Sequence, residues 1–263
     1  DMYYIHTTGN DSLSCIYVAD PAYAQANWQI NIDSWTSLCQ GTILQTTTYV
    51  PDDNFEQALI DLGYDDVLND SVLTANISGV TTLNVSNDSI SDLTGIEGFT
   101  ALTNLHCGYN QLPSLDVSSN TALTNLNCLG NVLTALDVSS NTALTAFHCG
   151  TNQLTSLDVS ANTSLSSLTC WNNQLTSLDV SNNTALTFLV CDHNGLTTLD
   201  VSANTALDWF TCNNNQLTSL DVSNNTVLTH LGVKYNELTS LDVSSNTILD
   251  YLRCNISQLT SLD

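Results

Sequence analysis

The segment that decides the fold reads Leu154-Thr-Ser-Leu157-Asp-Val159-Ser-Ala-Asn162, and it is followed by Leu165-Ser-Ser-Leu168-Thr-Cys170-Trp-Asn-Asn173. Both halves have the form Leu-x-x-Leu-x-(Val/Cys)-x-x-Asn. The second Leu and the Val or Cys are two residues apart, so in an extended strand both side chains point to one face and the residue between them points to the other. Each half therefore predicts a short strand with an inward apolar pair, followed by a turn that the Asn side chain can stabilise.

The same pattern recurs at one constant step along the chain, and Val233 fills the one position where Cys is missing. The recurring positions are Cys107, Cys128, Cys149, Cys170, Cys191, Cys212 and Cys254; Asp116, Asp137, Asp158, Asp179, Asp200, Asp221, Asp242 and Asp263; and Asn110, Asn131, Asn152, Asn173, Asn194, Asn215 and Asn236. A regular repeat without insertions predicts a β-rich solenoid, because one turn cannot bury its apolar face and must stack on its neighbours. Two short parallel strands per turn would form two parallel sheets, with strands roughly 4.8 Å apart, around a core of Leu, Val and Cys. The stacked asparagines would form two ladders.

This pattern, which runs from about Val80 to Asp263, is the leucine-rich repeat in a 21-residue form with Cys in place of one consensus Leu. It resembles the repeats of the internalin J-like family, bacterial surface adhesins with a cysteine ladder, and those of secreted leucine-rich repeat proteins of gliding bacteria. The resemblance implies a bacterial protein that is secreted or exposed on the cell surface. For function, a shared fold is only an analogy.

Residues 49–79 precede the regular repeats and predict a helical cap followed by an acidic turn. A capping residue, Asp52 or Asp53, comes before apolar residues at i, i+4 and i+7, and Gly63 terminates the helix. We expect this helix to cover the open end of the solenoid core, which is formed by residues 80–263.

Residues 1–48 match neither pattern and carry Cys15 and Cys39. Two interpretations stay open for this segment. It is either the closing segment of a preceding repeat array, as in the proteins of gliding bacteria, or a free-standing N-terminal cap. Because the chain starts at Asp1 and stops within a repeat at Asp263, we expect it to be a piece of a longer protein.

The composition limits the classes of partner. The chain has 263 residues, of which 26 are acidic and 2 are basic, so its formal net charge is −24. Nucleic acids and anionic membranes are bound through clustered Lys and Arg, and this charge therefore excludes both. No apolar run approaches the ~20 residues that span a bilayer, so no membrane insertion is expected.

The chain contains nine cysteines, which raises the question of metal or redox chemistry. Seven of them share the inward position of one strand, and stacked parallel side chains do not supply the dihedral angle that a disulfide requires. We therefore expect these seven, the cysteine ladder, to be reduced and buried thiols that act as small hydrophobic residues. Cys15 and Cys39 lie outside the ladder, and the exported context favours a disulfide between them.

One Asp per turn faces outward in the Leu-Asp-Val half, and we call these residues the Asp column. Carboxylates ~5 Å apart repel by ~0.8 kcal/mol per neighbouring pair even in water, so solvent, salt or bound cations must offset the repulsion. A solvated face that keeps the solenoid soluble is one interpretation, and bridging calcium is another, because calcium prefers hard oxygen ligands. The regular Thr and Ser columns also resemble flat ice-binding surfaces, which is a weaker alternative.

A second calcium candidate follows the cap helix. Four oxygen-bearing side chains occur close together, at Asp65, Asp66, Asn69 and Asp70. The stretch lacks the full calcium-loop pattern, so an ordinary acidic turn is the simpler interpretation. The sequence requires no cofactor, and calcium is the one cofactor for which it offers ligands.

Function is expected on the other strand of each turn, because its outward residues vary. The position before the inward Leu or Phe reads Asn104, Asn125, Ala146 and Ser167, and then Phe188, Trp209, His230 and Tyr251. The last four are rings on consecutive turns, and we call them the aromatic column; Trp171, Tyr235 and Arg253 lie nearby. Large aromatic side chains with no core to bury them usually mark a binding site. The alternative is that the rings only stabilise the turns or contact a C-terminal cap.

No catalytic constellation fits such a shallow surface. His106 and His148 share a column but lie two turns apart, and the strand spacing separates them by about 10 Å, which is too far for one metal. We therefore predict that the domain is not an enzyme. It is expected to be an extracellular adhesion domain that binds a protein or glycan through the variable strand face, since aromatic faces can stack on sugar rings. The alternative is a structural segment of a long cell-surface stalk or filament, which would contact neighbouring repeat arrays of the same chain or protein.

Overall fold

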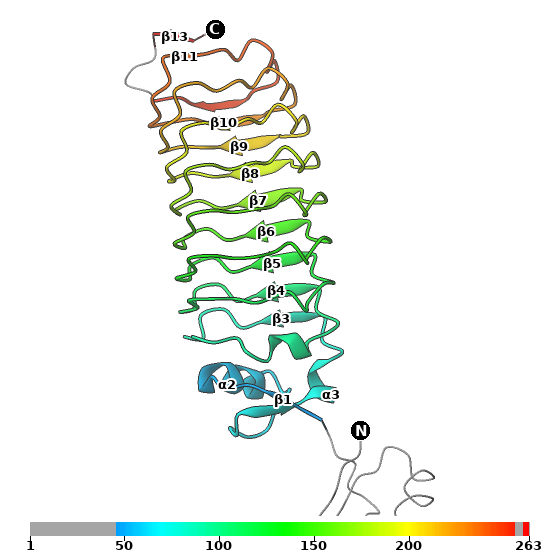
Figure 1. Cartoon of the computed structure of the whole chain (residues 1–263). Coiled ribbons are helices and arrows are strands. Elements are labelled where there is room, and N and C mark those ends of the chain that lie inside the picture. The colour runs from blue at the N-terminus through cyan, green and yellow to red at the C-terminus, as the bar shows by residue number, and fades with distance from the viewer. Residues whose placement is uncertain (1–45, 256–259, 263) are drawn as a thin grey trace, which may run out of the picture. The chain divides into compact units, whose positions relative to one another are not determined.

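The computed structural model describes residues 46–255 and 260–262, and every feature below concerns these residues. Its elements are β1 (Thr47–Tyr49), α2 (Asp53–Asp61), β2 (Ser71–Leu73), α3 (Thr74–Ile77), β3 (Thr82–Asn84), the 3-10 helix η2 (Ile96–Gly98), β4 (Asn104–His106), β5 (Asn125–Asn127), β6 (Ala146–His148), β7 (Ser167–Thr169), β8 (Phe188–Val190), β9 (Trp209–Thr211), β10 (His230–Gly232), β11 (Ser240–Leu241), β12 (Tyr251–Arg253) and β13 (Ser261–Leu262). Nine of the strands form one parallel sheet in the order β12-β10-β9-β8-β7-β6-β5-β4-β3, so each turn stacks on the next (Figure 1). The predicted leucine-rich repeat solenoid is confirmed.

The strand register follows the sequence repeat. Leu168 pairs with Leu189, and Leu189 pairs with Phe210. The central residue of each of these strands is buried, whereas the residues before and after it reach solvent. The inward Leu, Val, Phe and Cys side chains thus form one continuous core, which extends from Val50 to Leu241.

The Leu-Asp-Val half of each turn differs from the expectation of a second continuous sheet. Among the described residues, this side forms a sheet only where β11 pairs with β13. A turn follows each of these segments: Asp158 Oδ1 accepts the backbone N–H of Ser160 at 2.9 Å, and Asn162 N–H donates to Val159 O at 3.0 Å. The chain turns directly after Val159, which keeps the extended segment on this side short. The apolar pair itself, Leu157 and Val159, is buried as predicted.

Two asparagine ladders join successive turns. In the first, Asn173 Nδ2 donates to Cys149 O at 3.1 Å and to Cys170 O at 3.0 Å, while its Oδ1 accepts Leu154 N–H. In the second, Asn183 Nδ2 donates to Val159 O at 3.0 Å and to Asn162 O at 2.9 Å. Each amide therefore donates to carbonyl groups of its own or the preceding turn and links the two turns.

The cysteine ladder lies inside the core. Six of its members are fully buried, Cys254 is half-buried, and all seven are free thiols. Burial raises the pKa of Cys128 and Cys170 to about 12, so their reactive thiolate forms are scarce at neutral pH. The prediction of reduced, buried thiols is confirmed. Cys15 and Cys39 lie outside the described residues, so their disulfide stays a prediction.

Helix α2 covers the N-terminal end of the core, as predicted. Asp52 is the N-cap: its Oδ1 accepts Asn54 N–H and Phe55 N–H, both at 3.0 Å, and its Oδ2 accepts Ser91 N–H at 2.9 Å and Ser91 Oγ–H at 2.7 Å. Burial alone would raise the pKa of Asp52, but these hydrogen bonds outweigh it and hold the pKa below its usual value. One carboxylate thus joins the cap to the first turn. The ring of Phe55 packs 6.5 Å from that of Phe99, measured between centroids.

Two details of the cap differ from the sequence pattern. Leu62, at the i+7 position, is exposed, because α2 ends at Asp61 and the backbone reverses at Gly63 with φ of 79°. The predicted boundary after residue 48 falls inside β1, which pairs antiparallel with β2.

No helix in the described part of the chain is both long and apolar enough to cross a bilayer.

The second asparagine ladder can be tested at Asn183. The substitution Asn183→Ala removes one of the two hydrogen bonds that each of the carbonyls of Val159 and Asn162 accepts, so we expect the free energy of unfolding to fall by about 1–3 kcal/mol. The control is Asn182→Ala, because Asn182 is exposed and reaches only Ser160 O at 3.5 Å; its effect should stay within about 0.5 kcal/mol. Urea denaturation compares the two variants, and equal losses would contradict the assigned role.

The burial of the thiols predicts their reactivity. In the folded protein, iodoacetamide should modify Cys254 and leave the six buried cysteines unmodified, because their raised pKa and lack of exposure both suppress thiolate attack. Peptide mass mapping after a brief reaction at neutral pH measures this. Alkylation of the denatured, unreduced chain serves as the reference, and it should modify seven cysteines if Cys15 and Cys39 are bridged and nine if they are not. Rapid labelling of Cys170 in the folded state would contradict the buried ladder.

Candidate functional site

The four rings of the aromatic column form a continuous stack on consecutive turns. The ring centroids of Phe188 and Trp209 lie 5.7 Å apart with planes at 25°, and those of Trp209 and His230 lie 4.1 Å apart at 14°. His230 and Tyr251 follow at 5.6 Å and 31°. The four rings come from β8, β9, β10 and β12, whose parallel register places the same strand position side by side on successive turns.

Stacking determines which part of each ring meets solvent. Trp209 is 37% and Tyr251 44% exposed, while Phe188 and His230 are half-buried. Because neighbouring rings cover one another's faces, the column offers mainly ring edges to a partner. An aromatic edge carries partial positive charge and the face partial negative charge. The column is therefore an apolar ridge whose interior rings have no free face for a sugar.

The aromatic column forms one side of a shallow groove of about 450 Å³. The floor is formed by Val190, Thr211 and Gly232, which occupy the third position of β8, β9 and β10. Asp192 and Asn213 line the opposite side, and Arg253 lies at the C-terminal end. The groove therefore combines an apolar ridge, a floor of small side chains, and a polar wall.

The polar wall is held by its own hydrogen bonds. Asp192 accepts Asn213 N–H at 2.7 Å through Oδ1 and Asn213 Nδ2–H at 3.1 Å through Oδ2. Asn213 Oδ1 in turn accepts Lys234 N–H at 2.8 Å. Gly232 is needed here, because a Cβ at this position would lie 2.9 Å from both Asn213 Nδ2 and Thr211 Cγ2. The wall and the floor are thus fixed before any partner binds.

The remaining predicted residues are divided between the groove and its surroundings. Arg253 lines the groove, with its guanidinium carbon 5.8 Å from the centroid of the Tyr251 ring. Tyr235 is exposed outside the groove, and the Lys234 ammonium lies 4.1 Å from the centroid of its ring. Trp171 lies over Gly150, where a Cβ would be 2.7 Å from the indole Nε1; it does not line the groove.

The sequence reasoning missed Asp192 and Asn213. Both stand two residues after a strand, where the earlier turns carry Gly108, Leu129 and Gly150. That change from apolar or small residues to polar ones was a signal, and it begins in the same turn as the aromatic column. The hydrogen bonds between Asp192 and Asn213 join two successive turns, and they are visible only in the structure.

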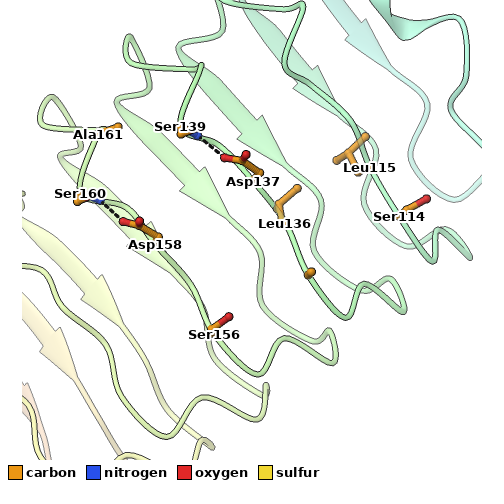
Figure 2. A pocket seen from close by; sticks show the side chains of 10 residues that line it. Ser114, Leu115, Leu136, Asp137, Ser139, Ser156, Asp158, Ser160 and Ala161 are labelled. Atoms are coloured by element: carbon orange, nitrogen blue, oxygen red, sulfur yellow. Dashed lines mark hydrogen bonds between the residues drawn. The ribbon is translucent and has the colours of Figure 1, made fainter.

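The Asp column lies on another side of the solenoid, beside a shallow groove of about 490 Å³ (Figure 2). Asp137 and Asp158 are exposed, and each accepts the N–H of the serine two residues later, at 2.8 and 2.9 Å. Hydrogen bonds from Ser139 and Ser160 hold the pKa values of the two carboxyls below the usual value. The column therefore stays ionised at neutral pH, and one oxygen of each carboxylate is occupied by the turn.

The structure brings together a different acidic set at the cap from the one the sequence suggests. Among the described residues, Asp53, Glu56 and Asp70 place carboxylate oxygens within 4.8 Å of one another. Of the predicted ligands Asp65, Asp66, Asn69 and Asp70, only Asp70 belongs to this set. Both oxygens of the buried Glu56 are already engaged, since they accept backbone N–H groups of residues 69–71 at 2.9 to 3.1 Å. Calcium stays a prediction.

Over 85 residues, the chain is 42% identical to internalin J of Listeria monocytogenes serotype 4b (strain F2365), a stretch that is 32% of this chain and 9% of internalin J. The ladder of buried cysteines, which recurs once per turn, matches this sequence likeness. The repeats are internalin-like leucine-rich repeats with a cysteine ladder. No protein-family model matches the chain.

Two solved structures of internalins are similar to the chain. The internalin-like chain has 31% identity to the functional domain of internalin J from Listeria monocytogenes, which includes a cysteine ladder; the match covers 83% of this chain and 64% of that chain, with a TM-score of 0.45. Internalin C2 from the same species has a TM-score of 0.67 at 21% identity and covers 84% of this chain and 99% of that chain, which shows the fold. The likeness of the repeats to internalin J agrees with the prediction that this domain is not an enzyme.

The Asp column predicts a dependence of stability on pH. Because the folded pKa values of Asp158 and Asp179 are lowered, these carboxylates favour the folded state above the unfolded pKa of about 4, and this contribution is lost as the pH falls through the folded values. The variant D158N/D179N keeps an oxygen acceptor at both positions but cannot titrate. Urea denaturation should therefore show a smaller loss of stability for the variant than for the native domain between about pH 5 and pH 2. Parallel curves would contradict the prediction.

Proposed function

We propose that this internalin-like domain is an extracellular binding domain whose partner docks on the groove beside the aromatic column. The observation that carries the proposal is the stack of four rings on the variable strand face, at a position where earlier turns hold Asn104, Asn125, Ala146 and Ser167. The fold is complete with small residues there, so the rings are not a packing requirement. A rigid aromatic ridge beside a fixed polar wall provides the preformed contact area that binding sites use.

The proposed location is the cell surface or the secreted fraction. The likeness to internalin J supports it, although the matched segment spans only 9% of that protein. Within the groove, Phe188, Trp209, His230, Tyr251 and Arg253 would contact the partner, and Asp192 and Asn213 would determine its orientation.

The stalk interpretation is the second candidate. It is favoured by the uniform stacking of the turns, which the two asparagine ladders maintain along the solenoid. The ice-binding interpretation finds less support in the structure. In one Thr column the hydroxyls donate to backbone carbonyls of the preceding turn, as from Thr124 to Thr103 O at 3.1 Å and from Thr145 to Thr124 O at 3.1 Å, so those donors do not order surface water.

A binding screen with and without calcium tests the proposal. Labelled native domain is applied to arrays of glycans, mucins and extracellular proteins, each in calcium and in chelator. In the variant F188A/W209A/Y251A, affinity for any ligand found should fall by at least about 30-fold, since a buried aromatic anchor contributes about 2 kcal/mol or more. Alanine already occupies this position at Ala146, so the variant should fold.

The matched control is Tyr109→Ala, which removes an exposed ring from an N-terminal turn. It should bind like the native domain. If the triple variant also binds like the native domain, the groove is not the site. If nothing binds and negative-stain images show filaments, the stalk function replaces this one.

A further inference from the structure

The residue that precedes each strand of the large sheet normally carries a hydroxyl that stabilises the stack. Five members of this column donate the hydroxyl to a backbone carbonyl of the preceding turn, at 3.0 to 3.2 Å: Thr103, Thr124, Thr145, Ser166 and Thr187. Thr229 shares its hydroxyl between Asp208 O, at 3.4 Å, and the Asp208 carboxylate, and Thr81 stands before the first strand of the sheet. The two exceptions, which have no hydroxyl, are Asp208 and Asp250. An ionised carboxylate cannot donate, so both positions give up a bond that the rest of the column makes.

Both exceptions stand directly beside the aromatic column. Asp208 precedes Trp209, Asp250 precedes Tyr251, and both carboxylates are exposed. Asp208 accepts the Thr229 hydroxyl, whereas the side chain of Asp250 makes no hydrogen bond within the described residues. A residue that weakens a repeat and adds negative charge to a chain of net charge −24 is retained more readily for binding than for stability.

The charges on the variable face are confined to the turns of the aromatic column. Before Phe188, the strand-flanking and outward positions of this face carry no Asp, Glu, Lys or Arg. From Phe188 onward they carry three carboxylates, Asp192, Asp208 and Asp250, together with the two basic side chains of the chain, Lys234 and Arg253. Both cations lie over rings of the chain itself, those of Tyr235 and Tyr251.

We propose that the partner at this groove is a basic polypeptide surface, on which Lys or Arg side chains alternate with apolar ones. This inference rests on the proposed binding function. The apolar residues would pack on the ridge formed by the rings. The basic side chains would reach Asp192 in the wall of the groove, and Asp208 and Asp250, which precede Trp209 and Tyr251 outside the groove lining. Charge complementarity carries the choice of partner: the whole domain attracts cations over long range, and the local carboxylates place them beside the ridge.

The ring geometry disfavours a neutral glycan as the occupant. A sugar ring packs on the face of an aromatic side chain, but the faces within this column are covered by rings at centroid distances of 4.1 to 5.7 Å. Ring edges instead suit aliphatic side chains and the carbonyl oxygens of a peptide backbone, because the edge carries partial positive charge.

The experiment uses the whole chain and three sets of short synthetic peptides with the same apolar residues. The alternate positions are Lys or Arg in the first set, Glu in the second and Ser in the third. The test variant is D208T/D250T, which installs the residue that the column itself prefers, so its melting temperature should equal or exceed that of the native domain. The matched control is D158N/D179N, which changes the net charge by the same amount on the Asp column.

We expect the basic peptides to bind most tightly, with an affinity that falls as salt increases. D208T/D250T should lower that affinity about tenfold, because it removes the carboxylates beside the bound peptide. D158N/D179N should leave the affinity within about twofold, because exposed carboxylates on the Asp column are not in contact with the peptide. Preference for the Ser or Glu peptides, equal losses in the two variants, or no bound peptide would overturn the proposal.

The outcome also separates this inference from the function on which it rests. If a glycan or a neutral peptide binds, and F188A/W209A/Y251A loses it while D208T/D250T does not, the groove is the site but its partner is not basic. If the ring variant loses nothing, the binding function of the groove fails together with this inference.

Discussion

The structure depends on one constraint: a single turn of the repeat cannot bury its own apolar face or satisfy its own carbonyl groups. Both needs are met by the neighbouring turn. The amide of Asn173 bonds to Cys149 O of the preceding turn and to Cys170 O of its own. On the second side of the solenoid, the amide of Asn183 bonds to Val159 O and Asn162 O, both of the preceding turn. Because these bonds link successive turns, each turn fixes the spacing and the register of the next.

This constraint divides the residues into those that stacking requires and those that it leaves free. Inward Leu, Val and Cys and the ladder asparagines are required, whereas the outward positions of the large sheet tolerate side chains as different as Ala146 and Trp209. In a repeat protein, the residues that stabilise the stack and the residues that bind a partner therefore occupy different positions of the repeat. Asp208 and Asp250 matter for that reason, since they stand in a column that otherwise contributes to stability and yet give up its hydroxyl bond.

The sequence was sufficient for the features that repeat and insufficient for those that depend on single turns. The constant step of the repeat predicted the sheet, the buried thiols, both ladders and the placement of the rings on consecutive turns, because residues one repeat apart become neighbours when the turns stack. It did not predict that Asp158 would close a turn with Ser160, nor that the second side would form so little sheet, since side-chain hydrogen bonds to the backbone leave no trace in the apolar pattern. The wall of Asp192 and Asn213 also escaped, because it joins two turns through side chains that occur once.

The stacking of the four rings on consecutive turns limits which partners they can bind. Each ring in the column stands over the ring of the next turn, and Trp209 and His230 are only 4.1 Å apart. Their relative positions are set by the strand register, so little conformational entropy remains to be lost when a partner docks. The same proximity covers the ring faces and turns the edges outward. A repeat that carries aromatic residues on consecutive turns thereby exchanges the sugar-binding face of an isolated ring for a stiff apolar ridge, and the chemistry of the flanking column then decides which partner that ridge selects.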